Sequence, residues 1–440
     1  MNDLEPRRYK YGISPFTIGV IGFLYTGALI FSYFESNFLN TYLDHVLELS
    51  PLHIAVMVSL SAFIGLTFLP LWGIISDNTR TKYGRRRPFL PLGIIAGAAM
   101  IIYAFSEAYV WCVILDAVII GIFSNALYAG QRTLIPDLVD IEYRGRVNGI
   151  VNILGSLGIV IGIAMTLIAN EYFTTPRGRG NIITQEGHIF LLSFAGGIFI
   201  IAAIVGFLCI REKPEEFPPK KPLLIALKEM FNPSELKKHR EFFKLILAIT
   251  VYKSGLGIIM PYLFNFIFSL GLETIELVLV LGTAAPLLFI SIFILGKLTD
   301  SYGRKKFLIP ITLLSSLGFI TLPFLAESRA INLYLLIPVI TLILVGALGI
   351  LIPLDTWSQD LLPDDKRAQF FGILNIVNTL SQIVGAILGG IIATALIGKV
   401  LNPLGWLFAF VPIFLISALP LFIRVKETLP ENFQKDLKVL

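Results

Sequence analysis

Long apolar stretches alternate with short polar ones along almost the whole chain. A helix needs about 20 apolar residues to cross the hydrocarbon core of a bilayer. The pattern therefore predicts twelve membrane-spanning helices. We place them at residues 14–38, 53–76, 89–107, 110–134, 147–170, 188–210, 244–268, 274–297, 306–325, 332–357, 369–395 and 404–423.

The composition agrees with a membrane protein of many spans. Of the 440 residues, 55% are hydrophobic and only 15% are charged, whereas a soluble domain carries roughly 25% charged residues. The polar start of the chain does not read as a signal peptide, because the first apolar run is too long for one. The two cysteines, Cys112 and Cys209, lie in or beside apolar runs, so they predict neither a disulfide framework nor a metal site.

Lys and Arg residues gather on one side of the predicted spans. Of the 35 in the chain, 29 fall on the side of the two termini and four on the other side, while Arg132 and Lys253 lie inside apolar runs. Loops rich in Lys and Arg stay in the cytoplasm. We therefore expect both termini to be cytoplasmic, in a multi-pass protein of the cell (plasma) membrane. The scattered positive charge does not indicate nucleic acid as a partner.

The two halves of the chain repeat each other at an offset of 223 residues. This offset carries Asp77 to Asp300 and Asn152 to Asn375. The repeat predicts an all-α membrane protein whose twelve transmembrane helices form two pseudo-symmetric six-helix bundles. The predicted domains are an N-terminal bundle, a charged cytoplasmic connector, and a C-terminal bundle with a cytoplasmic tail, at residues 1–210, 211–243 and 244–440.

Several of these segments resemble the major facilitator superfamily. GKLTDSYGRKKF (296–307) is similar to its loop signature G-x-x-x-D-x-x-G-R-K/R, and GIISDNTRTKYGRRRPF (73–89) is a longer copy. The longer form resembles the glycoside–pentoside–hexuronide cation symporters and the plant-type sucrose transporters, as do SNALYAGQRTLIPDL (124–138) and FGILNIVNTLSQ (371–382). The sucrose carriers' fourth-helix aspartate falls on Gly121, which argues against strict sucrose transport.

The resemblance implies the major facilitator fold, transport by alternating access and a substrate site near the midplane between the halves. It implies no enzymatic activity and no cofactor, and a protein that works as a monomer.

The basic loops after the second and eighth predicted spans favour a cytoplasmic gate. Asp77 would end its helix at the C-terminus, where the helix dipole disfavours a carboxylate. We therefore expect an arginine partner from its own loop or from a neighbouring helix. The alternative is that these loops only fix topology. The predicted gate comprises Asp77, Arg85, Arg86, Asp300, Arg304 and Lys305.

Ionisable residues occur on the first, fourth, seventh and tenth predicted helices, whereas the other eight carry none in their central portions. A charge inside a span costs a few kcal/mol, so each one is a functional candidate. The resemblance implies that these helices line the central cavity. Asp116, Glu35 and Asp355 are the candidates for proton coupling, and Lys253 and Arg132 for substrate contact. A structural salt bridge, such as Arg132 with Asp355, is the alternative reading.

Polar uncharged side chains on the fourth and eleventh helices complete the predicted substrate site. Asn125, Tyr128 and Gln131 follow the i, i+3, i+6 spacing of one helix face. Amides and aromatic rings suit the hydroxyls and the apolar face of a sugar, although amides also join helices to each other. The predicted substrate-binding residues are Asn125, Tyr128, Gln131, Arg132, Lys253, Asn375, Asn378 and Gln382.

These features predict a secondary active transporter that moves a sugar or glycoside by proton-coupled symport. Membrane lipid surrounds it, and no bound metal is expected. The absence of an ATP-binding motif argues against a primary pump. Three alternatives stay open: sodium coupling, export of an amphipathic or anionic small molecule, and a membrane scaffold or receptor that has lost transport.

Overall fold

The structure is a computed structural model of the chain. It describes residues 13–140, 143–212, 239–303, 305–328, 331–361 and 367–428. Most of the predicted connector, 211–243, lies outside these ranges.

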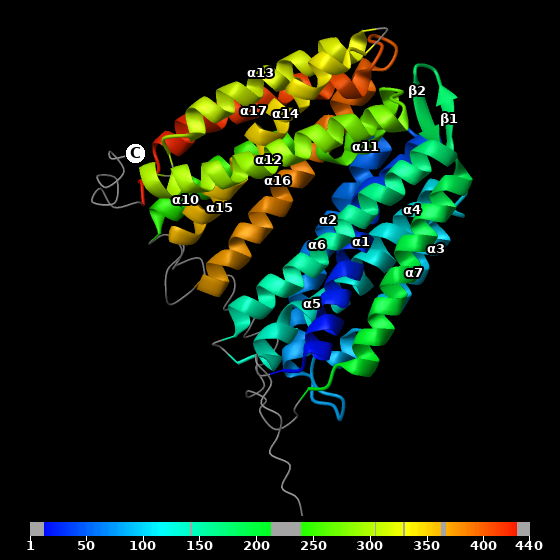
Figure 1. Cartoon of the computed structure of the whole chain (residues 1–440), viewed down its shortest axis with the longest axis vertical. Helices are drawn as coiled ribbons and strands as arrows, with labels where there is room; N and C mark the ends of the chain where they lie inside the picture. The colour runs from blue at the N-terminus through cyan, green and yellow to red at the C-terminus, as the bar shows by residue number, and fades with distance from the viewer. Residues whose placement is uncertain are drawn as a thin grey trace, which may run out of the picture. The chain divides into compact units, whose positions relative to one another are not determined.

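Helices occupy the apolar runs of the N-terminal half (Figure 1). The first and second runs form one helix each, whereas the fourth run is divided into three consecutive helical segments. The elements are α1 (Pro15–His45), α2 (Pro51–Asn78), η1 (Arg87–Phe89), α3 (Leu92–Tyr103), α4 (Tyr109–Val113), η2 (Ile114–Ile120), α5 (Gly121–Leu138), α6 (Arg144–Tyr172), β1 (Thr174–Arg177), β2 (Gly180–Ile183) and α7 (Gln185–Cys209).

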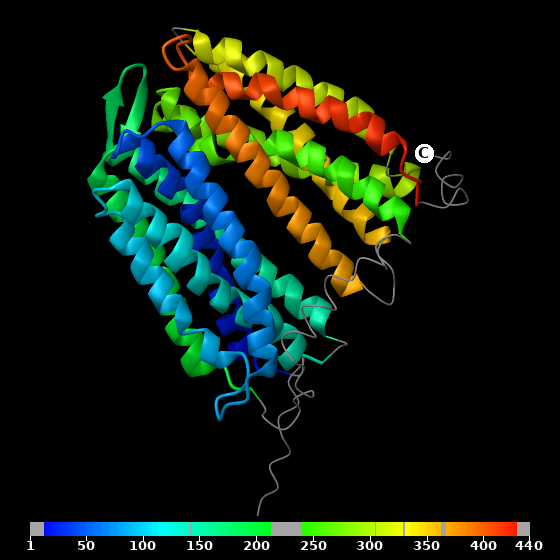
Figure 2. The ribbon, with the colours of Figure 1, turned by 180° about the vertical axis from the view of Figure 1, so that it is seen from behind.

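The regular elements described in the C-terminal half are all helices (Figure 2). Its first run is again interrupted, here by a short 3₁₀ turn. The elements are α10 (Arg240–Gly257), η4 (Met260–Tyr262), α11 (Leu263–Ser269), α12 (Thr274–Tyr302), α13 (Leu308–Glu327), α14 (Leu333–Gly349), α15 (Leu351–Asp360), α16 (Arg367–Leu396) and α17 (Pro403–Ile423).

In the described part of the chain, nine helices are long and apolar enough to cross a membrane. Three further apolar helical stretches are shorter, and they coincide with the third, eighth and tenth predicted runs: Arg87–Tyr103, Thr274–Leu288 and Leu333–Ala347. The chain is therefore an all-α membrane protein with many spans, as the hydropathy pattern predicts.

The described residues fall into two compact units. The first holds the residues up to 48, from 60 to 175 and from 183 to 212, and the second holds 49–59, 176–182 and 239–428. In the first unit α1 packs on α6 and α7, and α3 packs on α7; in the second, α10 packs on α16 and α17, and α13 packs on α17. The internal repeat of the sequence thus reappears as the same set of helix contacts in each unit.

Each unit contains a close glycine contact between two of its own helices, and the two helix pairs are equivalent in the repeat. A Cβ atom on Gly158 of α6 would lie 2.6 Å from the Thr26 carbonyl oxygen of α1. A Cβ atom on Gly385 of α16 would lie 2.4 Å from the Ser254 carbonyl oxygen of α10. Only glycine permits such an approach, which is the use that membrane helices make of small residues.

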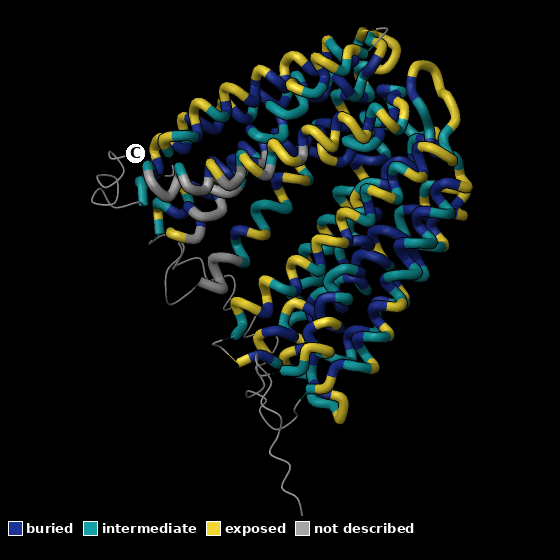
Figure 3. The backbone as a smooth tube through the Cα atoms, in the orientation of Figure 1, coloured by how far each residue is buried: buried dark blue, intermediate teal, exposed yellow. Residues whose placement is uncertain are grey.

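Exposed residues, yellow in Figure 3, follow one another along α13, and many of them are large and apolar. Leu317 and Phe324 of that helix are 60% and 61% exposed. A soluble protein would bury such side chains, whereas a membrane protein places them against lipid tails.

A β-hairpin between α6 and α7 departs from the predicted all-helical pattern. β1 and β2 form a two-stranded sheet, and Gly178 at the turn has a φ of +65°. A positive φ at the first of two turn residues is what a type II′ hairpin turn requires, and glycine adopts it without strain. The hydropathy pattern missed this element because both strands are only four residues long.

Candidate functional site

Arg86, in the loop between α2 and α3, is the centre of a charged cluster in the first unit. Its side chain is only 4% exposed. The guanidinium donates to Asp77 Oδ1 at 2.5 Å, to Ser76 Oγ at 2.6 Å and to Asp137 Oδ2 at 2.9 Å. Arg86 is therefore the arginine partner that Asp77 was expected to have, supplied by its own loop.

Asp137, near the C-terminal end of α5, links two arginines of that loop. Arg85 donates to its two carboxylate oxygens at 2.5 and 3.1 Å, while Arg86 shares one of them. A bidentate arginine–carboxylate ion pair is stronger and more directional than one with a single hydrogen bond. The cluster thus ties the ends of α2 and α5 to the start of α3. We call Asp77, Arg85, Arg86 and Asp137 the Arg86 cluster.

Glu212, just after α7, holds the backbone of the same loop. Its carboxylate accepts the backbone N–H groups of Arg85 at 3.0 Å, Arg86 at 2.9 Å and Arg87 at 2.7 Å. A carboxylate facing consecutive N–H groups makes charge-assisted hydrogen bonds. Glu212 therefore fixes the turn from which the Arg86 cluster is built.

The glycine of this loop motif is required for that contact. Gly84 has a φ of +109°, and a Cβ atom there would lie 2.6 Å from the Glu212 Cδ atom. Both the backbone conformation and the space exclude a side chain.

The second half carries a related contact at the equivalent loop. Gly303 has a φ of +99°, and the backbone N–H of Lys305 donates to Glu427 Oε2 at 3.0 Å. The Lys305 ammonium donates to the Ile423 carbonyl at 3.1 Å. The other predicted gate residues of this half, the Asp300 side chain and Arg304, lie outside the described residues.

Asp137, Glu212 and Glu427 were missed by the sequence analysis. The available signal was the acid that follows the last apolar run of each half, in REK for Glu212 and in VKE for Glu427. The loop motif does not contain these acids, although the backbone N–H groups of the loop need an acceptor.

Removing the Glu212 carboxylate is expected to destabilise the first unit. Glu212→Ala should lower the free energy of unfolding by about 2 kcal/mol, because hydrogen bonds to a charged group contribute about 1.5–3 kcal/mol and water replaces part of the loss. Thermal unfolding of the detergent-solubilised protein measures this change. Glu107→Ala, at an exposed acid of another loop, is the matched control. Equal melting temperatures for the two variants would contradict the role assigned to Glu212.

Two carboxyl groups come together inside the first unit. Asp116 is only 4% exposed, and Ser61 of α2 is hydrogen-bonded to its carboxyl group. The Glu35 carboxyl of α1 interacts electrostatically with that of Asp116. Glu35 and Asp116 thus form a pair of interacting acids from two helices of the first unit.

Asp116 lies in a π-helical stretch. η2 covers Ile114–Ile120 between α4 and α5, within one continuous run of helix. π-helical turns are rare and occur frequently at functional sites, because they widen the helix at one point. Here the widened turn presents Asp116 to α2.

The predicted residues of α5 differ in their surroundings. The Asn125 side chain donates to the Gly121 carbonyl of its own helix at 2.6 Å. Gln131 is 3% exposed, and neither its Oε1 atom nor the Tyr128 hydroxyl has a hydrogen-bond partner among the described residues. Arg132 is exposed and interacts electrostatically with the Tyr128 hydroxyl, as Glu35 also does. The structure thus brings Glu35, Tyr128 and Arg132 into one electrostatic group.

The predicted residues of the second unit lie on α10 and α16. Lys253 and Asn378 are half-buried, whereas Asn375 and Gln382 are exposed. The Oδ1 atom of Asn378 has no hydrogen-bond partner among the described residues. The Asp355 side chain lies outside the described residues, so its pairing with Arg132 stays a prediction. Within the described ranges no group of three or more His, Cys, Asp or Glu could hold a metal ion.

Many apolar spans, buried acids within them and charged loops at their ends define a multi-pass membrane transporter. A family profile described as Major Facilitator Superfamily matches residues 18–385 and, in a second alignment, 253–438. The chain belongs to this superfamily, whose members are transporters and not enzymes. Its assignment to the glycoside–pentoside–hexuronide symporters stays a prediction.

The curated relatives include an efflux pump and a tetracycline resistance protein. The multi-drug resistance efflux pump PmrA of Streptococcus pneumoniae is 28% identical over 263 residues, which cover 57% of this chain and 58% of the relative. The class H tetracycline resistance protein of Pasteurella multocida is 34% identical over 204 residues, covering 43% and 48%. An uncharacterized transporter of Bacillus subtilis, YwbF, is 28% identical over 179 residues, covering 39% and 40%. The chain thus spans about half the length of these relatives.

Solved structures match over nearly the whole chain. A bacterial homolog of the human lysosomal transporter Spinster, inward-facing and occupied, gives a TM-score of 0.70 at 14% identity and covers 95% of this chain and 97% of that one. The nucleoside transporter NupG also gives 0.70, at 13% identity, covering 93% and 98%. At these identities the likeness establishes the fold alone.

Proposed function

We propose that this transporter couples the movement of a small organic solute to protons, with Asp116 and Glu35 as the proton-carrying pair. The observation that carries the proposal is that Asp116, which is buried in a π-helical turn, interacts electrostatically with the Glu35 carboxyl group. One proton on such a pair removes the repulsion between two negative charges in an apolar environment. Loading and release of that proton then accompany the change in access to the site.

A sugar or glycoside is the first solute class that we propose. Asn125, Tyr128 and Gln131 offer amides and a phenol on one helix, and the Gln131 oxygen and the Tyr128 hydroxyl have no described protein partner. Buried polar atoms without a partner are costly, so a ligand with many hydroxyl groups would satisfy them.

Export of an amphipathic compound is the second candidate. The printed names of two curated relatives, an efflux pump and a tetracycline resistance protein, favour it. Two acids in apolar surroundings would also suit an organic cation in exchange for protons.

The remaining parts of the proposal concern the cell. We place both termini in the cytoplasm because of the distribution of Lys and Arg, and the protein in the plasma membrane as a monomer. The Arg86 cluster then lies at the cytoplasmic end, where it would form part of the gate.

Solute-driven proton movement in proteoliposomes tests the proposal. The panel holds a disaccharide, a pentose, a hexose, a hexuronate and the amphipathic cation ethidium, each added with a pH-sensitive dye inside. We expect one sugar to acidify the lumen when it enters. If none of the sugars acidifies the lumen but ethidium drives a proton flux, export of an amphipathic compound is the function that the result supports. No proton flux with any solute, from protein with a normal melting temperature, would overturn it.

A further inference from the structure

Three cations gather around the C-terminal end of α7 in the first unit. Lys82 and Arg87 come from the loop between α2 and α3, and Arg211 lies two residues after the last residue of α7. Lys82 and Arg211 are exposed, and Arg87 is half-buried. We call Lys82, Arg87 and Arg211 the α7 cation group.

Two aromatic rings position two of these cations. The Lys82 ammonium lies 5.0 Å and the Arg87 guanidinium carbon 5.4 Å from the centre of the Tyr83 ring. The same guanidinium carbon lies 4.8 Å from the centre of the Phe207 ring, and the two ring centres are 5.7 Å apart. A cation over the face of an aromatic ring is attracted by the ring quadrupole. The rings therefore fix two positive charges beside the last turn of α7.

The acids nearest to this group already have other partners. Asp77 and Asp137 pair with arginines of the Arg86 cluster, and the Glu212 carboxylate accepts the backbone N–H groups of residues 85–87. Within the described ranges, no ion pair joins a carboxylate to any member of the α7 cation group. The group thus offers positive charge to a ligand from outside the chain.

An exposed apolar stripe of α7 leads to the same place. Ile201, Ile204 and Leu208 follow the i, i+3, i+7 spacing of one helix face and are 49%, 40% and 61% exposed. The intervening Ala202 and Ala203 are buried. α7 is long and apolar enough to cross a membrane, and exposed apolar side chains of a span contact lipid tails. The stripe therefore brings acyl chains up to the α7 cation group.

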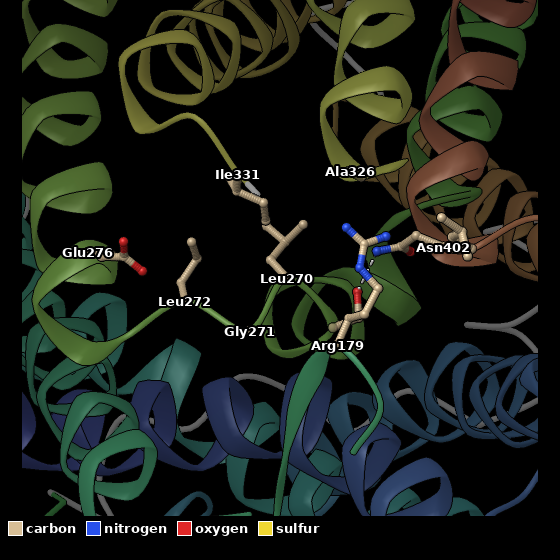
Figure 4. Close-up of a pocket in the computed structure, with 10 residues that line it drawn as sticks. Arg179, Leu270, Gly271, Leu272, Glu276, Ala326, Ile331 and Asn402 are labelled. Carbon is tan, nitrogen blue, oxygen red and sulfur yellow. Dashed lines mark hydrogen bonds between the residues drawn. The ribbon is translucent and has the colours of Figure 1, made fainter. Parts of the chain in front are cut away.

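A cavity in the second unit shows the contrast. It has a volume of about 200 Å³ and is lined by residues that all cluster with that unit, among them Arg179, Glu276 and Asn402 (Figure 4). A cation and an acid in one lining offset each other's charge. This cavity therefore offers an anion less than the α7 cation group does.

We propose that the end of α7 binds an anionic phospholipid. The acyl chains lie along the exposed stripe, and the phosphate meets the α7 cation group at the membrane surface. Arg and Lys bind phosphate through charge-assisted hydrogen bonds, and clusters of them beside a span attract anionic lipids. The site requires only that α7 ends at a membrane surface. It depends neither on the solute nor on the coupling ion.

Quenching by brominated lipids measures which lipid occupies the stripe. Ile204→Cys carries a bimane fluorophore in protein with Cys209→Ala, while Cys112 is buried. Nanodiscs hold phosphatidylglycerol and phosphatidylcholine in equal amounts, with bromine on the acyl chains of one lipid or of the other. We expect brominated phosphatidylglycerol to quench the label more strongly. Leu317→Cys on α13, which is 60% exposed, is the control position, where both lipids should quench equally.

Lys82→Gln together with Arg211→Gln is expected to lower the preference for phosphatidylglycerol about tenfold, which corresponds to about 1.4 kcal/mol. Each cation near an anionic lipid contributes on this scale. Arg87 stays in place, because its guanidinium also donates to the last carbonyls of α7. Lys306→Gln together with Lys399→Gln removes two exposed cations of the second unit and should leave the preference unchanged.

Added salt gives a test that needs no substitution. Sodium chloride should weaken the preference in protein that keeps all three cations, because salt screens exposed charges. Equal quenching by the two brominated lipids at position 204 would overturn the proposal, and so would a preference that survives the loss of Lys82 and Arg211. If inorganic phosphate removes the preference and sodium chloride of equal ionic strength does not, the cations bind a soluble phosphate and the lipid site is wrong.

Discussion

Arg86→Ala is expected to lower the free energy of unfolding by about 3 kcal/mol, the lower end of the range for breaking a buried ion pair. The substitution leaves Asp137, whose side chain is 16% exposed, with one arginine in place of two. It also removes the partner of Asp77, but that side chain is 58% exposed and water compensates much of its loss. Thermal unfolding in detergent should show a decrease of about 6–12 °C.

Two variants make this result specific to the cluster. Arg80→Ala removes a half-buried arginine of the same loop, whose guanidinium donates to the backbone carbonyls of Asp77 and Thr79. It should lower the melting temperature less than Arg86→Ala does. Arg86→Lys should not restore stability, because one ammonium cannot replace a planar guanidinium that contacts Ser76, Asp77 and Asp137 together. A decrease no larger than that of Arg80→Ala would refute the central position of Arg86.

The Arg86 cluster shows how far a local motif can be read. The loop motif identified Asp77, Arg85 and Arg86, because the same signature recurs, in a shorter form, in the second half. It could not identify Asp137 or Glu212, which lie 51 residues and 126 residues from Arg86 in sequence. Their partnership depends on how α5 and α7 pack around the loop, and packing has no signature in the spacing of single residues.

The helices were predictable for a different physical reason. Each apolar run must satisfy its backbone hydrogen bonds internally in a membrane, so length and hydropathy alone indicate a helix. The same argument says nothing about a widened turn, so the π-helical stretch η2 could not be predicted from hydropathy. It also says nothing about a short loop outside the membrane, which explains why the hairpin with Arg179 was not predicted.

The candidate site was predictable only as a set of residue types. A charge inside an apolar run is costly enough to be noticed in any sequence, and Glu35, Asp116 and Lys253 were found in this way. Which of them share a site depends on the rotation of each helix. Asp116 and Arg132 are 16 residues apart in one predicted helix, about 24 Å, so the sequence excludes a contact between them. The proximity of Asp116 to Glu35 and Ser61 appears only in three dimensions.

Asp116→Asn is expected to abolish solute-driven proton movement while the protein stays folded. The amide keeps the size of the carboxyl group and can still bond to Ser61, but it cannot bind and release a proton. Proton flux in proteoliposomes should fall to the level of liposomes without protein. Counterflow of labelled solute, which needs no net proton transfer, should continue at a comparable rate. The separation of these two rates assigns Asp116 to coupling and not to solute binding.

Glu35→Gln and Ser61→Ala give the comparison that decides between one acid and a pair. If the two carboxyl groups act as a pair, Glu35→Gln should also separate proton flux from solute movement. Ser61→Ala keeps both carboxyl groups, so it should retain coupled transport. Loss of coupling in both amide variants, with coupling kept in Ser61→Ala, would support the pair. Coupled transport at full rate in Asp116→Asn would exclude Asp116 as the proton carrier, and the search would pass to Glu35 alone.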